Sequence, residues 1–209
     1  MMFLNIANMV AKTNALGPGM RAVIWVQGCK LRCPGCIAPG WLPFEPALQL
    51  TPQEVVDQLV SDDNDISGLT FSGGEPMEQA EALAEVAHLA RERNNLDIIC
   101  FSGYRYQTLR YRPPNPAVAR LLSYVDVLIE GPYIQRLNDS RGLRGSSNQR
   151  IIHLTDRLKH IPLEDQTRQV ELKIEEGALT LVGIPTPEVS EVLEHLITKK
   201  FDSKQRISL

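Results

Sequence analysis

The chain has 209 residues, of which 43% are hydrophobic, and it carries a formal net charge of −3 with a pI near 5.8. This length suits one domain that spans 1–209 and buries a full hydrophobic core. The small negative charge gives no chain-wide electrostatic reason to bind nucleic acid or an anionic membrane, so we expect small molecules and proteins as partners.

The lack of a membrane span or secretion signal, and the way cysteine is used, both indicate a cytoplasmic protein. No apolar stretch is long enough to cross a bilayer, and residues 1–6 lack the basic segment and long apolar core of a secretion signal. Three of the four cysteines fall within eight residues, which is unlike a disulfide framework and is typical of a metal site built from reduced thiols.

Four apolar runs, each followed at once by a glycine, are typical of the central strands of a parallel sheet. They span residues 21–27, 68–72, 97–102 and 125–130. Helical patterns lie between them, at 51–60 with a capping box, at 77–93 with acidic residues early and basic residues late, and at 115–122. This alternation predicts an α/β fold in which functional residues follow the carboxyl ends of the strands.

The pattern of apolar and polar residues changes after residue 150. Residues 170–174 and 179–182 alternate around Glu176-Gly177, which predicts a hairpin. Thr186-Pro187 then opens a last helix whose apolar face includes Val189, Val192, Leu193 and Leu196. We expect this hairpin and helix, from about 170 onward, to be an appendage of the same domain.

Cys29, Cys33 and Cys36 have the spacing Cys-x-x-x-Cys-x-x-Cys and follow the first predicted strand. Thiolates suit zinc or an iron–sulfur cluster, and three of them leave one coordination position open. Cys100 lies in an apolar strand and is expected to be buried and inert. His153 could complete a zinc site, although a lone histidine in an apolar run is more often a core residue. A separate alternative is that the chain is a non-catalytic cysteine–metal module, either zinc-binding or electron-carrying.

A second motif, Gly73-Gly74-Glu75, lies where the second predicted strand gives way to a helix. Glycines there let a ligand approach the backbone closely, and the glutamate offers a carboxylate to a cationic group. The two motifs, in this order and on consecutive strand ends, resemble the radical S-adenosylmethionine superfamily. That resemblance implies a partial (β/α) barrel with an open side, in which Cys29, Cys33 and Cys36 ligate a [4Fe-4S] cluster and Gly73, Gly74 and Glu75 hold S-adenosylmethionine.

Further segments resemble one subfamily, the activating proteins of anaerobic ribonucleotide reductase. They are Leu16-Gly17-Pro18-Gly19-Met20-Arg21, Trp25-Val26-Gln27-Gly28-Cys29, Cys33-Pro34-Gly35-Cys36, Phe101-Ser102-Gly103-Tyr104, the run 126–133 and the run 144–150. After the last cysteine, Ile37 and Ala38 replace the aromatic residue and asparagine of that subfamily, which leaves backbone contacts to adenine.

The resemblance implies further site residues. Ser102 and Glu130 are expected to line the cosubstrate pocket, because each ends a predicted strand. Ser147, Asn148 and Gln149 are expected to shape the entry of a partner's glycine loop, although their composition also fits a solvated loop.

The function implied is reductive cleavage of S-adenosylmethionine and formation of a glycyl radical on a partner enzyme, the anaerobic ribonucleotide reductase large subunit. A one-electron donor such as flavodoxin is implied with it. The alternatives are another small radical enzyme with a different protein or small-molecule substrate, and the non-catalytic metal module.

Overall fold

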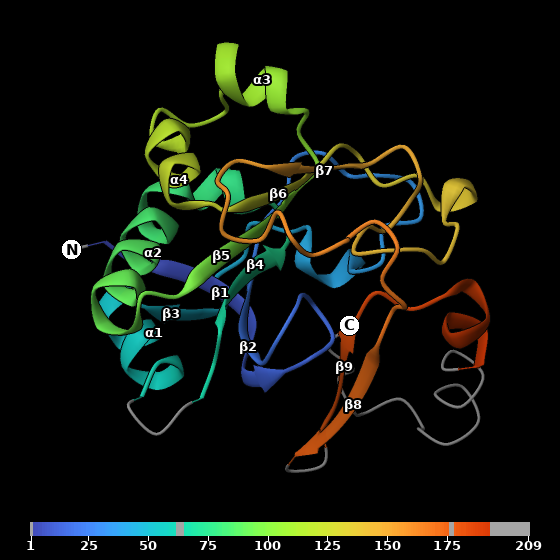
Figure 1. The fold of residues 1–209 in the computed structure, drawn as a ribbon, viewed down its shortest axis with the longest axis horizontal. Coiled ribbons are helices and arrows are strands. Elements are labelled where there is room, and N and C mark those ends of the chain that lie inside the picture. Colours follow the sequence, from blue (N-terminus) through green and yellow to red (C-terminus); the bar gives the residue numbers. More distant parts are fainter. Residues whose placement is uncertain (1, 62–64, 176–177, 193–209) are drawn as a thin grey trace.

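A computed structural model describes residues 2–61, 65–175 and 178–192, and its main feature is a seven-stranded mixed sheet (Figure 1). The strand order is β3-β1-β2-β4-β5-β6-β7, and β8 pairs only with β9 in a separate antiparallel hairpin. The strands are β1 (Leu4–Thr13), β2 (Arg21–Val26), β3 (Leu48–Leu50), β4 (Gly68–Gly73), β5 (Asp97–Ser102), β6 (Val127–Glu130), β7 (Arg150–His153), β8 (Val170–Glu175) and β9 (Ala178–Gly183).

The four central strands are parallel and follow one another across the sheet in chain order. The connections between them carry α1 (Pro52–Leu59), α2 (Ala80–Asn94), α3 (Tyr106–Tyr111) and α4 (Val118–Tyr124). Winding in one direction is the topology of a (β/α) barrel, but β3 and β7 end this sheet without pairing with each other. The α/β partial barrel with an open side is therefore confirmed.

The two faces of the sheet have different coverings, because alternate residues of a strand point to opposite faces. Ile24 of β2 and Leu128 of β6 pack with α1, α2 and α4 in the largest core cluster. Val23 and Trp25 of β2 point to the other face, where loops and β9 cover them. Because α1, α2 and α4 all cover the outer face (Figure 1), the inner face is left to a cavity, β9 and the loops.

Arg21 is fully buried and fixes the amino ends of the parallel strands. Its guanidinium is 2.7 Å from the carboxylate of Asp97 and donates to the hydroxyl of Thr70 at 2.8 Å. That hydroxyl in turn donates to the carbonyl of Leu16 at 2.9 Å. Arg21, the last residue of the Leu16–Arg21 segment, therefore has a structural role, because a buried charge needs an ion-pair partner and hydrogen bonds.

The structure contains elements that the pattern did not predict, and it moves some predicted boundaries by two or three residues. Strand β1 pairs with both β2 and β3, and two register shifts along it disturb the alternation that marks a strand. β7 and α3 are only four and six residues long. The helix predicted to begin at 77 begins at Ala80, because Pro76–Gln79 forms a 3-10 turn.

The predicted hairpin is confirmed as β8 and β9, with its turn at 176–177 outside the described residues. A helix begins at residue 187, as expected, and is described as far as 192, so Leu193 and Leu196 lie outside the described residues. None of the helices in the described part of the chain has both the length and the apolar character needed to span a membrane.

Candidate active site

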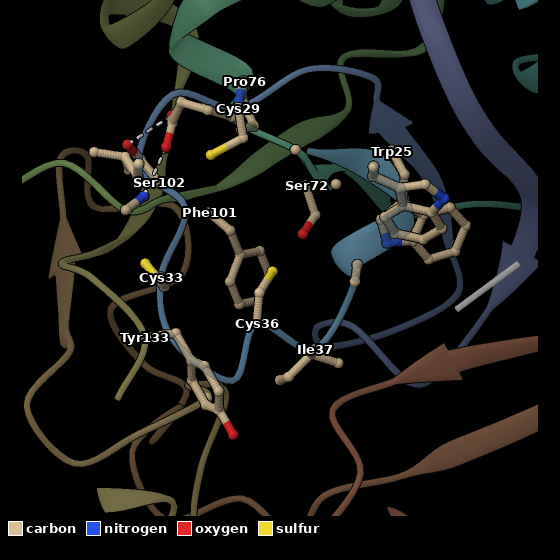
Figure 2. Close-up of a pocket in the computed structure, with 18 of the residues that line it drawn as sticks. Trp25, Cys29, Cys33, Cys36, Ile37, Ser72, Pro76, Phe101, Ser102 and Tyr133 are labelled. Carbon is tan, nitrogen blue, oxygen red and sulfur yellow. Dashed lines mark hydrogen bonds between the residues drawn. The ribbon is translucent and has the colours of Figure 1, made fainter. Parts of the chain in front are cut away.

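A cavity opens at the carboxyl ends of the central strands, where both sequence motifs meet (Figure 2). Loop residues after β2 supply one wall, residues after β4 a second, and residues after β5 and β6 a third. The lining includes nine of the predicted site residues: Cys29, Cys33, Cys36, Ile37, Gly73, Gly74, Glu75, Ser102 and Gln149. The convergence follows from the parallel sheet, because its strands end at one edge.

Backbone hydrogen bonds close the base of the cysteine loop. The N–H of Gly28 donates to the carbonyl of Trp41 at 2.8 Å, and the N–H of Cys29 donates to that of Leu42 at 3.0 Å. The same loop is tied to the second motif, because the N–H of Glu75 donates to the carbonyl of Gly28 at 2.9 Å. The thiols and the Gly-Gly-Glu segment are therefore held as one unit.

The three thiols are suited in kind and number to a cluster with one open iron. Cys29 is buried, whereas Cys33 and Cys36 are partly exposed, and burial raises the pKa of the Cys29 and Cys36 thiols above its ordinary range. The positive charge of bound iron favours the thiolates that burial disfavours. In the described part of the chain no three Cys, His, Asp or Glu side chains gather as a single-ion site does. In an iron–sulfur cluster, by contrast, the cysteine ligands bind different irons.

Glu75 is 1% exposed, and its carboxylate organises the second motif. One oxygen accepts from the N–H of Met77 at 3.0 Å and the hydroxyl of Ser102 at 2.9 Å, and the other accepts from the N–H of Gly103 at 2.8 Å. Burial raises the pKa of this carboxyl to about 7. A carboxylate has about four acceptor sites, so three donors leave room for a cationic ligand.

Gly73 and Gly74 leave no space for a side chain. A β-carbon on Gly73 would lie 2.4 Å from the backbone nitrogen of Val26, and one on Gly74 would lie 2.4 Å from the carbonyl oxygen of Gly28. Gly73 also has φ of +104°, a conformation that favours glycine. Gly73 is therefore required by the close approach of β4 to β2, and Gly74 by the contact with the cysteine loop, and both line the cavity.

The aromatic wall of the cavity was not predicted as part of the site. Trp25 and Trp41 lie with ring centroids 5.8 Å apart, and Phe101 and Tyr133 also line the cavity. In the sequence Trp25 and Phe101 fall within strand patterns, where an aromatic residue indicates only a core position. Such a wall provides an apolar surface on which a flat ring such as adenine can stack.

Glu130 does not line the cavity, in contrast to the expectation from its strand-end position. Its side chain is fully buried, forms a close ion pair with Arg150, and lies 3.8 Å from Arg105. The pairing of β6 with β7 puts Arg150 opposite Glu130, so the carboxylate turns to that edge. Gly131 lines the cavity in its place.

The segment 147–149 is only partly at the cavity. Ser147 is exposed, and the side-chain amide of Asn148 donates to the carbonyl of Pro132 at 2.8 Å, so neither residue lines the cavity. Gln149 does line it, and its side chain also ties the backbone of Gly145 and Gly131 together through hydrogen bonds of 2.8 Å. The segment therefore holds the shape of the loop that carries Tyr133.

Neither candidate for a fourth metal ligand is near the three thiols. Cys100 is 0% exposed on the helix-covered face of β5, and burial raises the pKa of its thiol well above the ordinary value, as expected of an inert thiol. His153 pairs with Val127 at the amino end of β6, opposite to the end that meets the cavity. The hypothesis of a zinc site completed by His153 is therefore wrong.

The chain is similar in sequence to a family model and to named proteins. Residues 15–152 match the family model of the 4Fe-4S single cluster domain. The anaerobic ribonucleoside-triphosphate reductase-activating protein of Salmonella typhi is 33% identical over 146 residues, which cover 66% of this chain and 91% of that protein. The pyruvate formate-lyase-activating enzyme of Clostridium pasteurianum is 36% identical over 94 residues, or 43% of this chain and 40% of that enzyme. A solved structure, QueE from Escherichia coli, aligns with 99% of this chain and 93% of its own at 13% identity and a TM-score of 0.44.

The family match, the reductase-activating relative and the cavity define the same class, a radical S-adenosylmethionine enzyme with one iron–sulfur cluster. The chain belongs to the 4Fe-4S single cluster domain family and is related to the activating proteins of anaerobic ribonucleoside-triphosphate reductase. Its cofactors are a [4Fe-4S] cluster and S-adenosylmethionine, and its activity is of the glycyl radical activating type.

Proposed function

We propose that this protein generates a glycyl radical on an anaerobic ribonucleotide reductase. The observation that carries the proposal is the meeting of the three-cysteine loop and the Gly-Gly-Glu segment in one cavity, in a chain related to reductase activating proteins. In this proposal Cys29, Cys33 and Cys36 ligate the cluster. A cytoplasmic donor such as flavodoxin supplies one electron, in a compartment that keeps thiols reduced.

The bound cofactors would supply the radical chemistry: one electron cleaves S-adenosylmethionine into methionine and a 5′-deoxyadenosyl radical, and this radical takes hydrogen from a glycine α-carbon to give 5′-deoxyadenosine. The chain's own residues bind and orient. The remaining acceptor site of Glu75 suits the amino group of the cosubstrate. The apolar wall of Trp25, Ile37 and Phe101 suits its adenosine and excludes water.

Anaerobic reconstitution with iron and sulfide, followed by reduction in the presence of S-adenosylmethionine, tests this proposal. We expect 5′-deoxyadenosine and methionine in equal amounts from the wild type and none from the Cys33→Ala variant. Addition of the purified reductase large subunit of the same organism is expected to give the doublet of a glycyl radical in electron paramagnetic resonance. A reconstituted wild type that forms no 5′-deoxyadenosine would falsify the proposal.

A second candidate substrate is a pyruvate formate-lyase, because a named activase of that enzyme is 36% identical over 94 residues. Parallel reactions with both purified partners separate the candidates. We expect the glycyl radical signal on the reductase, and a signal on the lyase alone would favour the second candidate.

A further inference from the structure

The β8–β9 hairpin lies beyond residues 15–152, the part of the chain that matches the family model. About two thirds of this chain correspond to 91% of the Salmonella typhi activating protein. The hairpin therefore lies outside the part of the chain that the family model describes.

One face of the hairpin fixes it to the sheet. The carboxylate of Glu171 accepts from the N–H of Asn14 at 2.8 Å, and the ammonium of Lys173 donates to the carbonyl of Lys12, at the end of β1. Val182, directly opposite Glu171, is fully buried in the cluster that contains Val23 and Trp25. These contacts give the hairpin a definite position, which a two-stranded sheet does not reach alone.

The opposite face is apolar, and it is exposed on β8 and half-buried on β9. Leu172 pairs with Leu181 and Ile174 pairs with Leu179, so these four side chains share one face by alternation. Leu172 is 52% exposed and Ile174 is 78% exposed. Two such residues side by side on a strand, with two leucines opposite, differ from the scattered single apolar residues of an ordinary surface and are typical of an interaction site.

This apolar face runs into the active-site cavity. Leu181 belongs to the face and also lines the cavity, as do Gly183 and Ile184 at the end of the hairpin. In Figure 1 the hairpin extends away from the seven-stranded sheet. Ile174 lies one residue before the end of β8, near the turn of the hairpin. A small molecule held in the cavity has no reason to touch Ile174, whereas a protein that inserts one residue into the cavity lies across this face.

We propose that the apolar face of Leu172, Ile174, Leu179 and Leu181 docks an apolar segment of the glycyl radical enzyme, beside the loop that enters the cavity. The inference rests on the proposed function and adds the surface that recognises the partner. Apolar side chains buried at the centre of such a contact favour binding, because their surface is removed from water. The part of the chain that matches the family model then supplies the radical chemistry, and the hairpin supplies affinity for this partner.

The test compares a double variant, Leu172→Thr with Ile174→Thr, with the wild type. Threonine keeps the strand preference of the hairpin and removes the apolar surface. We expect the Kd for the purified reductase large subunit, and its KM in glycyl radical formation, to rise about tenfold or more. Formation of 5′-deoxyadenosine without the partner, with a chemical reductant, is expected to stay at the wild-type rate.

The matched control is Tyr111→Gln on α3, which removes a 75% exposed aromatic side chain at the opposite end of the molecule from the hairpin (Figure 1). This variant is expected to keep the wild-type Kd and KM. Unchanged values in the double variant would overturn the inference, and so would an equal loss of 5′-deoxyadenosine formation. A shift from dimer to monomer in the double variant with unchanged KM would assign the face to a second copy of this chain and overturn it as well. A wild type that makes no 5′-deoxyadenosine refutes the proposed function, and the docking inference falls with it.

Discussion

At the scale of single residues, position distinguishes two buried thiols of the same chemistry. Cys29 follows β2 and lines the cavity, whereas Cys100 points from β5 into the helix-packed core. Substitution of Cys29, Cys33 or Cys36 by alanine is expected to abolish the cluster, because the loop then offers too few thiolates. Iron content and visible absorption after reconstitution measure this. Cys100→Ala is the control, and it is expected to retain the cluster and lose about 1 kcal/mol of stability.

The protonation of Glu75 predicts a pH dependence of stability. Burial raises the pKa of this carboxyl from 4.5 to about 7 in the folded protein, so the native state binds its proton more tightly than the unfolded chain. The stabilising effect is complete below pH 4.5 and is lost as the pH rises through 7, with a total of up to about 3 kcal/mol.

The variant Glu75→Gln isolates this effect, because glutamine does not titrate. We expect the difference in unfolding free energy between wild type and variant, measured with denaturant on the cluster-free protein, to change between pH 5 and pH 8 in favour of the variant. At low pH the wild type is expected to be at its most stable relative to the variant. A difference that stays constant over this range would show that Glu75 keeps an ordinary pKa.

At the scale of elements, the cysteine loop and the segment after β4 lie in close contact because Gly74 has no side chain. A side chain on Gly74 would meet the carbonyl oxygens of Gly28 and Trp41 at 2.4 and 2.9 Å. Gly74→Ala is therefore expected to push the two segments apart, cost about 1–3 kcal/mol and weaken retention of the cluster. Thermal unfolding and iron content after gel filtration measure both effects.

Gly40 offers a control within the same loop. A β-carbon there has no heavy atom within 4 Å, and its φ is not positive. Gly40→Ala is expected to change neither stability nor iron content appreciably. Equal losses in the two variants would show that the loop as a whole, and not its contact with Gly74, resists change.

At the scale of the whole molecule, the largest hydrophobic core and the iron–sulfur site lie on different faces of one sheet. The largest core cluster joins the strands to α1, α2 and α4, and its burial does not involve the cysteine loop. The fold is thus expected to survive removal of the cluster, unlike a small domain that folds only around its metal. After oxidative removal of iron, far-UV circular dichroism should stay near that of the loaded protein while the amide of Cys36 exchanges faster with solvent. Loss of secondary structure on iron removal would contradict this.

Much of the fold was predictable because it depends on local patterns. The four parallel strands are buried on both faces and appear as continuous apolar runs, and glycine follows each one. The capping box at Thr51 marks the start of α1 through contacts three residues apart. β1 was missed because its identity depends on pairing with β2 and β3 through irregular registers, which no local pattern shows.

The sequence alone determined the chemistry of the site: three thiols at a fixed spacing, two glycines before a glutamate, and their places at the ends of parallel strands. Tertiary structure decided what each group faces. Glu130 ends a strand as Ser102 does. The register with β7 places Glu130 opposite Arg150, with which it forms an ion pair, whereas the hydroxyl of Ser102 donates to the carboxylate of Glu75 at the cavity. Likewise, the hairpin was predictable as a hairpin, but its apolar face beside the cavity was not. Spacing along the chain fixes which groups are available, whereas packing between distant segments fixes which of them meet.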